Sequence, residues 1–118
     1  MVALKKVAQY ALYSDDQILN ILVEAFLREN PVFKNVPIPD TTDQRILSMA
    51  AALIELFAIN HNQEPPTWSA TIGEMPAPFF VWKGALRLAW DNHECLNEAP
   101  EPLKKRRIYT TANFLKAV

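Results

Sequence analysis

The longest apolar stretch of the chain runs from Ile46 to Ile59, where only Ser48 and Glu55 are polar. These two residues are seven apart, so on a helix they fall on one narrow stripe, which Thr41 and Asn62 extend. The remaining positions form an apolar face at helical spacing that covers most of the circumference: Ile46, Leu47, Met49, Ala50, Leu53, Ile54, Leu56, Phe57 and Ile59.

This pattern predicts a central helix over about residues 42–61, with Thr41 or Thr42 as its N-cap. Such a helix is covered by other elements on most sides, so Leu53 and Phe57 are expected in the core. The apolar run is shorter than the roughly 20 residues that cross a bilayer, and we expect no membrane association.

Two amphipathic segments precede the central helix. The first, Val2 to Tyr13, has its apolar residues at helical spacing: Leu4, Val7, Ala8, Ala11 and Leu12. Ser14 then has the features of an N-cap, because Gln17 completes a capping box. The second helix is expected to run to about Glu29 and to stop before Pro31, with its inward face made by Ile18, Leu19, Leu22, Val23, Phe26 and Leu27.

Proline-rich connectors flank the central helix. Residues 31–41 contain three prolines, and we expect the apolar residues among them to lie against the helices: Val32, Phe33, Val36 and Ile38. The connector from Gln63 to Phe80 contains four prolines and Trp68. Prolines lower the entropy lost on ordering a loop, and a buried indole needs a hydrogen-bond partner. We therefore interpret this connector as a latch that carries Trp68 against the helices.

The remaining sequence predicts a fourth helix from about 78 to 95 and a short fifth helix over 101–107, with a final turn after Thr110 or Thr111. Half of the residues are hydrophobic, and only two are glycine. The fold prediction is therefore a single compact all-α domain over residues 1–118, with about five helices around the central one. One cysteine excludes an internal disulfide, and we expect a cytoplasmic protein without a signal peptide.

A succession of short motifs fills the C-terminal half: Pro65-Pro66-x-Trp68, Pro78-Phe79-Phe80, Leu86-Arg87, Pro102-Leu103-Lys104-x-Arg106-Arg107-Ile108-Tyr109 and Asn113-Phe114-Leu115. This succession resembles a small uncharacterised bacterial all-α domain. Relatives of that kind are found alone or near helix-turn-helix regulators and toxin–antitoxin-like genes. The resemblance implies no established activity and no functional residues.

The densest charge cluster is Lys104-Lys105-Arg106-Arg107. Four adjacent cations can contact phosphates, which makes these residues candidates for binding nucleic acid. A solvated helical turn is the favoured interpretation, because the net charge is −1 and the chain has no second basic stripe. The aromatic residues of this half are likewise interpreted as packing anchors rather than base-stacking platforms: Trp68, Phe79, Phe80, Trp82, Trp90 and Tyr109.

Arg87 and His93 are the candidate catalytic pair. An Arg followed by a His on a helix resembles the active-site motif of HEPN-type ribonucleases, and that resemblance implies phosphate stabilisation by Arg87 and acid–base work by His93. The motif usually has a polar residue after the Arg, where this chain has Leu88. A surface cation and a histidine near a helix C-terminus are the favoured interpretation.

Metal and cofactor sites are not expected. His61, His93 and Cys95 do not make the four ligands of a structural zinc, and the chain has no glycine-rich phosphate loop. Three functions stay open: a non-enzymatic interaction module that docks a protein partner or itself, a nucleic-acid-associated regulator, and a HEPN-like ribonuclease. The excess of apolar and aromatic side chains favours the first.

Overall fold

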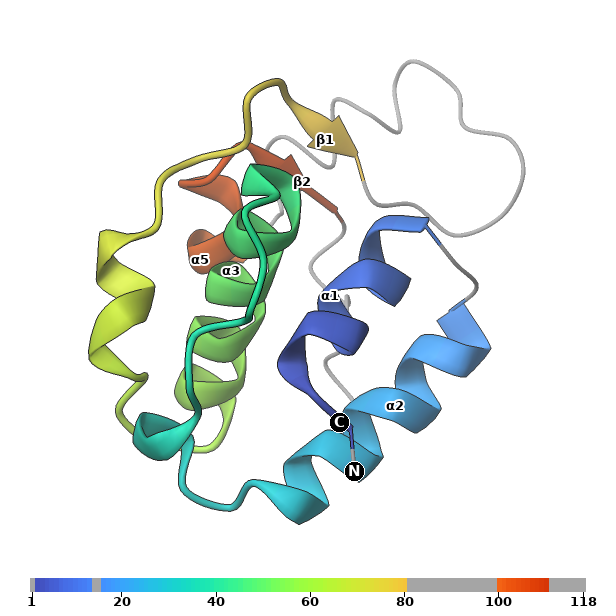
Figure 1. Cartoon of the computed structure of the whole chain (residues 1–118), viewed down its shortest axis with the longest axis vertical. Helices are drawn as coiled ribbons and strands as arrows, with labels where there is room; N and C mark the ends of the chain where they lie inside the picture. Colours follow the sequence, from blue (N-terminus) through green and yellow to red (C-terminus); the bar gives the residue numbers. More distant parts are fainter. Residues whose placement is uncertain (1, 14–15, 81–99, 111–118) are drawn as a thin grey trace.

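The chain is mostly helical (Figure 1), as the sequence predicts. The computed structural model describes residues 2–13, 16–80 and 100–110. Four α-helices, two 3₁₀ turns and two short strands lie in these residues: α1 (Leu4–Tyr13), α2 (Asp16–Glu29), η1 (Phe33–Asn35), α3 (Gln44–Asn60), η2 (Thr67–Thr71), β1 (Phe79–Phe80), α5 (Glu101–Lys104) and β2 (Ile108–Tyr109).

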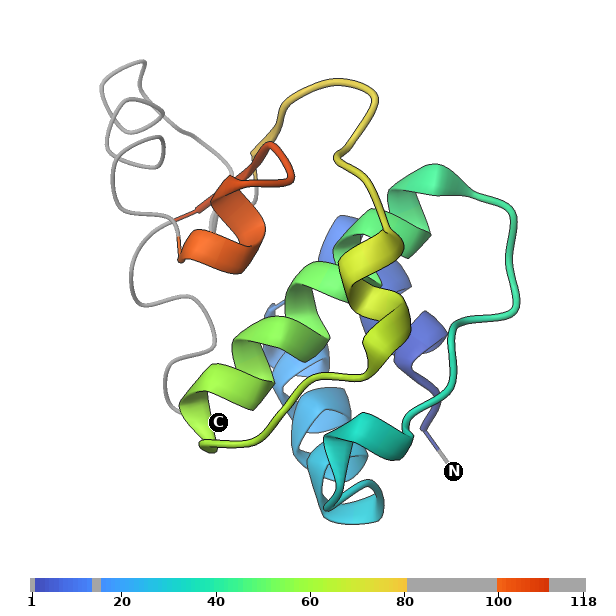
Figure 2. The ribbon, with the colours of Figure 1, turned by 90° about the vertical axis from the view of Figure 1, so that its left-hand side faces the viewer.

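Helix α3 packs against α1, α5 and η2, and Figure 2 shows these elements gathered along it. Every residue from Ala51 to Ala58 is buried, and Leu53 and Phe57 are fully buried as predicted. Ile59 is 61% exposed, so its predicted place on the apolar face is wrong. Two residues rotate a helix by about 200°, which directs Ile59 away from the side on which Phe57 meets Phe26 of α2.

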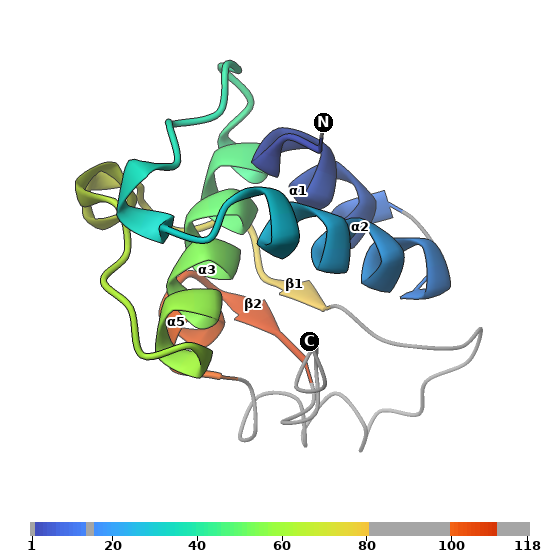
Figure 3. The same ribbon diagram turned by 90° about the horizontal axis from the view of Figure 1, so that it is seen from below.

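Helices α1 and α2 pack against each other beside α3 (Figure 3). All five predicted inward residues of α1 are buried, whereas α2 buries Leu19, Val23 and Phe26 and leaves Ile18 46% exposed. Leu22 and Leu27 are partly buried and pack against the core, so the predicted inward face of α2 is wrong only at Ile18, which lies at the edge of the apolar stripe. Helix α2 ends at Glu29 as expected, where the backbone N–H and side-chain amide of Asn30 both donate to the carbonyl of Phe26.

The N-cap of α3 is Asp43 rather than the predicted Thr41 or Thr42. Its carboxylate Oδ1 accepts from the N–H of Arg45 at 2.9 Å. Thr41 acts one step earlier, where its hydroxyl accepts from the N–H of Asp43 at 3.1 Å. Three neighbouring residues can all cap a helix, and the turn before α3 decides which side chain reaches its free N–H groups.

Two further predictions on the C-terminal half are wrong. The helix expected over 101–107 ends at Lys104, and Arg107 adopts a left-handed φ of 66°, which no helix continues. The chain then enters β2, which pairs in parallel with β1 through Phe79 and Ile108. Phe79–Phe80 is therefore a strand and not the start of a helix, because the backbone N–H groups of Met75 and Phe79 bond to the carbonyls of 106 and 107.

The rest of the predicted helix over 78–95, the Ser14 cap and the turn after Thr111 lie outside the described residues. Within the part of the chain that the structure describes, no helix has the length and apolar character needed to cross a bilayer.

Candidate binding cleft

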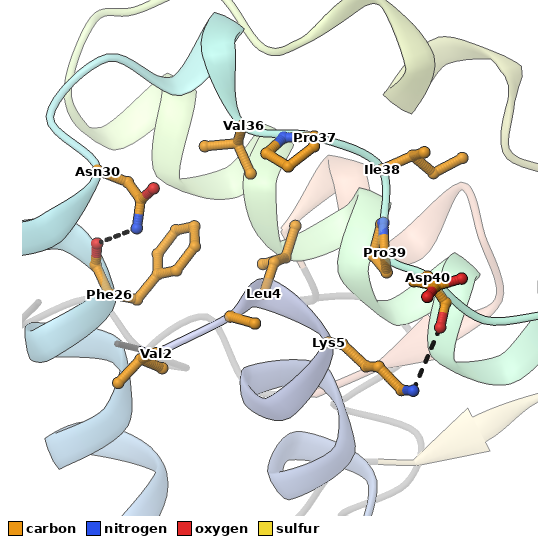
Figure 4. Close-up of a pocket in the computed structure, with 11 residues that line it drawn as sticks. Val2, Leu4, Lys5, Phe26, Asn30, Val36, Pro37, Ile38, Pro39 and Asp40 are labelled. Atoms are coloured by element: carbon orange, nitrogen blue, oxygen red, sulfur yellow. Dashed lines mark hydrogen bonds between the residues drawn. The ribbon is translucent and has the colours of Figure 1, made fainter.

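A cleft of about 510 Å³ lies between the N-terminal end of α1, the C-terminal end of α2 and the connector residues 36–40 (Figure 4). This volume is within the range of about 300–1,000 Å³ that ligand sites occupy. We call residues 36–40 the cleft wall. The complete lining is Val2, Ala3, Leu4, Lys5, Phe26, Asn30, Val36, Pro37, Ile38, Pro39 and Asp40.

The floor of the cleft is apolar and comes from three separate segments. Leu4 of α1, Phe26 of α2 and Val36 of the wall are 4%, 1% and 5% exposed, and Figure 4 shows their side chains converging. Each is the first or last core residue of its segment, so the floor forms where three amphipathic faces meet. Ile38 lies on the rim and is 49% exposed, which leaves apolar surface available to a ligand.

The rim carries one cation and one anion. The ammonium of Lys5 donates to the backbone carbonyl of Asp40 at 3.2 Å and closes one end of the cleft. An ammonium has three N–H groups, so this bond leaves two. The carboxylate of Asp40 is exposed and has no ion-pair partner among the described residues. The rim therefore offers both donors and an acceptor without a net charge.

Trp68 of η2 is hydrogen-bonded to the first residue of the cleft wall. Its indole Nε1 donates to the carbonyl of Val36 at 2.8 Å, and its half-buried ring packs against the core. Both features confirm the prediction that the connector carries Trp68 against the helices with a partner for its N–H. The wall is thus tied to a segment 32 residues further along the chain.

Gln63 fixes the segment that leads into the wall. Its side-chain Oε1 accepts from the N–H of Phe33 at 3.0 Å, and its Nε2 donates to the carbonyl of Pro31 at 2.8 Å. The ring of Phe33 is buried and meets the edge of His61 at 5.6 Å between centroids. Sequence reasoning missed this clamp, because a glutamine that bonds to backbone groups leaves no periodic signal.

The basic cluster of the C-terminal half does not form an open cationic surface. Arg106 is 3% exposed and makes two hydrogen bonds to the carboxylate of Glu55 on α3, at 2.7 and 3.1 Å. The same guanidinium donates to the carbonyls of Pro102 and Ser69, while its Nε has no partner. The isolated Glu55 in the apolar run was the sequence signal for this pair.

Two of the other three cluster members, Lys105 and Arg107, also lie near carboxylates. Lys105 Nζ is 3.0 Å from Glu55 Oε1, and Arg107 Nη1 is 3.9 Å from Glu74. Burial raises the pKa of Glu55. Hydrogen bonds from Arg106, Lys105 and Ser69 lower this pKa by more than burial raises it, so the carboxyl titrates below its ordinary range. Lys104 is left as the cation of this cluster without an acidic partner in the described structure.

The candidate catalytic residues Arg87 and His93 lie outside the described residues, as does Cys95. His61 is exposed at the end of α3, and no group of three or more potential metal ligands gathers among the residues described here. The chain matches no family model, no curated protein and no solved structure in the comparisons made with it.

Proposed function

We propose that this protein is a non-enzymatic interaction module that binds a short apolar peptide segment of a protein partner in the cleft. The observation that carries the proposal is the combination of an apolar floor with a rim that holds both Lys5 and Asp40. Sites of this kind bind through apolar contact and use a few polar groups for orientation.

The chemistry of the rim favours a peptide over a charged ligand. A carboxylate ligand is attracted by Lys5 and repelled by Asp40, and an amine meets the reverse situation. A peptide bond is neutral and presents a C=O that accepts from Lys5 and an N–H that donates to Asp40. Apolar side chains on either side of that bond then lie against the exposed apolar surface of the lining, of which Ile38 is 49% exposed, above the buried floor.

Because the wall is held in place before binding, it loses little conformational entropy when a peptide binds. Ordering a loop at the moment of binding weakens affinity, whereas a preformed surface avoids that cost. Trp68 and Gln63 hold the connector at the carbonyls of Val36 and Pro31 and at the N–H of Phe33. Docking therefore requires little rearrangement of the protein.

The test is a titration of ¹⁵N-labelled protein with a blocked di-leucine peptide, acetylated at its N-terminus and amidated at its C-terminus. We expect saturable shifts in the backbone amides of residues 2–5 and 26–30 and of Val36, Ile38 and Asp40. The forms with a free carboxylate or a free amine should bind more weakly, because each brings one repulsive contact to the rim. Absence of saturable shifts, or shifts confined to other residues, would contradict the proposal.

A pair of matched variants locates the binding. Ile38 and Val32 are both β-branched, lie in the same connector and are 49% and 44% exposed, but only Ile38 lines the cleft. Ile38→Asp should abolish peptide binding, and Val32→Asp should leave it unchanged. Equal loss in both variants would show that the connector as a whole, and not the cleft, is responsible.

A further inference from the structure

The cleft wall has an unusual shortage of hydrogen-bond donors. Pro37 and Pro39 have no backbone N–H, so the wall cannot be held by a ladder of its own donors. The N–H of Val36 donates to the carbonyl of Phe33 in the preceding turn η1. In the described part of the chain, two carbonyls of the wall bond to elements outside residues 31–41, Val36 to Trp68 and Asp40 to Lys5. The Lys5 tie is at the exposed end and is 3.2 Å long, while the Trp68 tie is 2.8 Å long and part-buried.

From this geometry we infer that Trp68 is a positioning residue, which sets the width of the cleft and senses its occupancy without touching the ligand. The inference rests on the proposed function. Trp68 is not part of the cleft lining. Val36 both lines the cleft and accepts the hydrogen bond from Trp68. The side chain of Val36 belongs to the floor, and its carbonyl accepts from the indole.

The coupling acts in both directions through Val36. Loss of the indole donor frees the buried end of the wall, so that binding must restore its position and the affinity falls. A peptide that presses on the wall in turn moves the carbonyl of Val36 relative to the indole. A backbone displacement of this kind changes the length of the hydrogen bond and therefore the chemical shift of the indole N–H.

The experiment uses the full chain and the blocked di-leucine peptide. Trp68→Phe keeps an aromatic ring and removes the N–H, and it should weaken peptide binding roughly three- to tenfold, as expected for one lost hydrogen bond. Ile108→Val is the matched control, because it removes one buried methyl group from β2, outside the cleft lining, and should lower stability by a similar amount. This control should bind the peptide with unchanged affinity.

A second readout does not require the variant to fold. In the parent protein, the indole N–H signal of Trp68 should shift along the same saturation curve as the amides of Val36, Ile38 and Asp40. Nuclear Overhauser contacts between the indole N–H and the ring protons of Trp68, in the sequentially assigned spectrum of the parent, identify this resonance. Its shift on titration is the signature of coupling, which a purely structural role does not give.

The outcomes separate the two proposals. If the parent binds no peptide, the proposed function itself fails. If the parent binds but the indole signal of Trp68 does not shift and Trp68→Phe binds equally well, the positioning role is overturned and the binding function stands. Equal weakening in Trp68→Phe and Ile108→Val overturns the positioning role as well, because the effect then follows stability alone.

Discussion

The buried pair of Glu55 and Arg106 allows the sharpest test of how the C-terminal segment is held on α3. Replacement of Arg106 by Met removes all four of its hydrogen bonds and leaves a carboxylate that is 8% exposed. Removal of one partner of a buried ion pair costs about 3–5 kcal/mol. Lys105 stays beside Glu55 at 3.0 Å, so we expect the lower end, about 3 kcal/mol.

The reverse variant, Glu55→Leu, leaves the guanidinium buried without a carboxylate and should cost at least as much. The double variant leaves neither charge stranded and only two carbonyls, of Pro102 and Ser69, without their donor. Its loss should therefore be smaller than the sum of the two single losses by about 2–3 kcal/mol. Lys105→Met, which removes a side chain that is 51% exposed, serves as the control and should cost less than about 1 kcal/mol.

Urea denaturation followed by far-ultraviolet circular dichroism measures these differences as shifts in midpoint at constant m. Additive losses in the double variant, or an Arg106→Met protein within about 0.5 kcal/mol of the parent, would refute the reasoning. Either result would mean that the segment over 100–110 is held by Leu103 and Ile108, which are fully buried, and not by the ion pair.

The same pair gives a pH dependence with a definite sign. The folded protein holds the pKa of Glu55 below its ordinary value of 4.5, since the hydrogen bonds of Arg106 and Lys105 outweigh the effect of burial. Its contribution to stability is therefore complete above the unfolded pKa and is lost as the pH falls through the folded pKa. The parent should have a higher urea midpoint than Glu55→Gln near neutral pH, and this difference in midpoint should shrink below about pH 4.5. A difference in midpoint that stays constant down to about pH 2 would contradict this.

Five further substitutions, two of which serve as comparisons, test the helices and the turns by urea or thermal unfolding. Leu53→Ala should cost about 2–5 kcal/mol, because the side chain is fully buried, and an unchanged midpoint would place α3 outside the core. Asp43→Ala should cost about 1 kcal/mol through loss of the N-cap bond, whereas Thr42→Ala should cost less. Arg107→Gly should stabilise the protein by up to about 1 kcal/mol through relief of a left-handed φ, and Asn62→Gly should gain less, because asparagine tolerates φ of 54° better.

Local patterns were sufficient to predict the helices of the N-terminal two thirds. The periodicity around Leu53, the stop signal at Asn30 before Pro31 and the proline content of the connectors depend on neighbours in the sequence, so they can be read from it. The prediction that the connector is a latch for Trp68 had the same basis, since it rested on prolines and an indole within one connector. The partner of its N–H, the carbonyl of Val36, had no local signal.

Tertiary structure alone decided the polar pairings and the cleft. Glu55 and Arg106 are 51 residues apart, and Gln63 reaches back about 30 residues to Phe33 and Pro31. Pairs at such separation depend on how helices pack, and the sequence leaves that packing open because many arrangements bury the same apolar faces. The two-residue strands exist for the same reason, since their residues pair only after the left-handed turn at Arg107 has brought 108–109 beside 79–80.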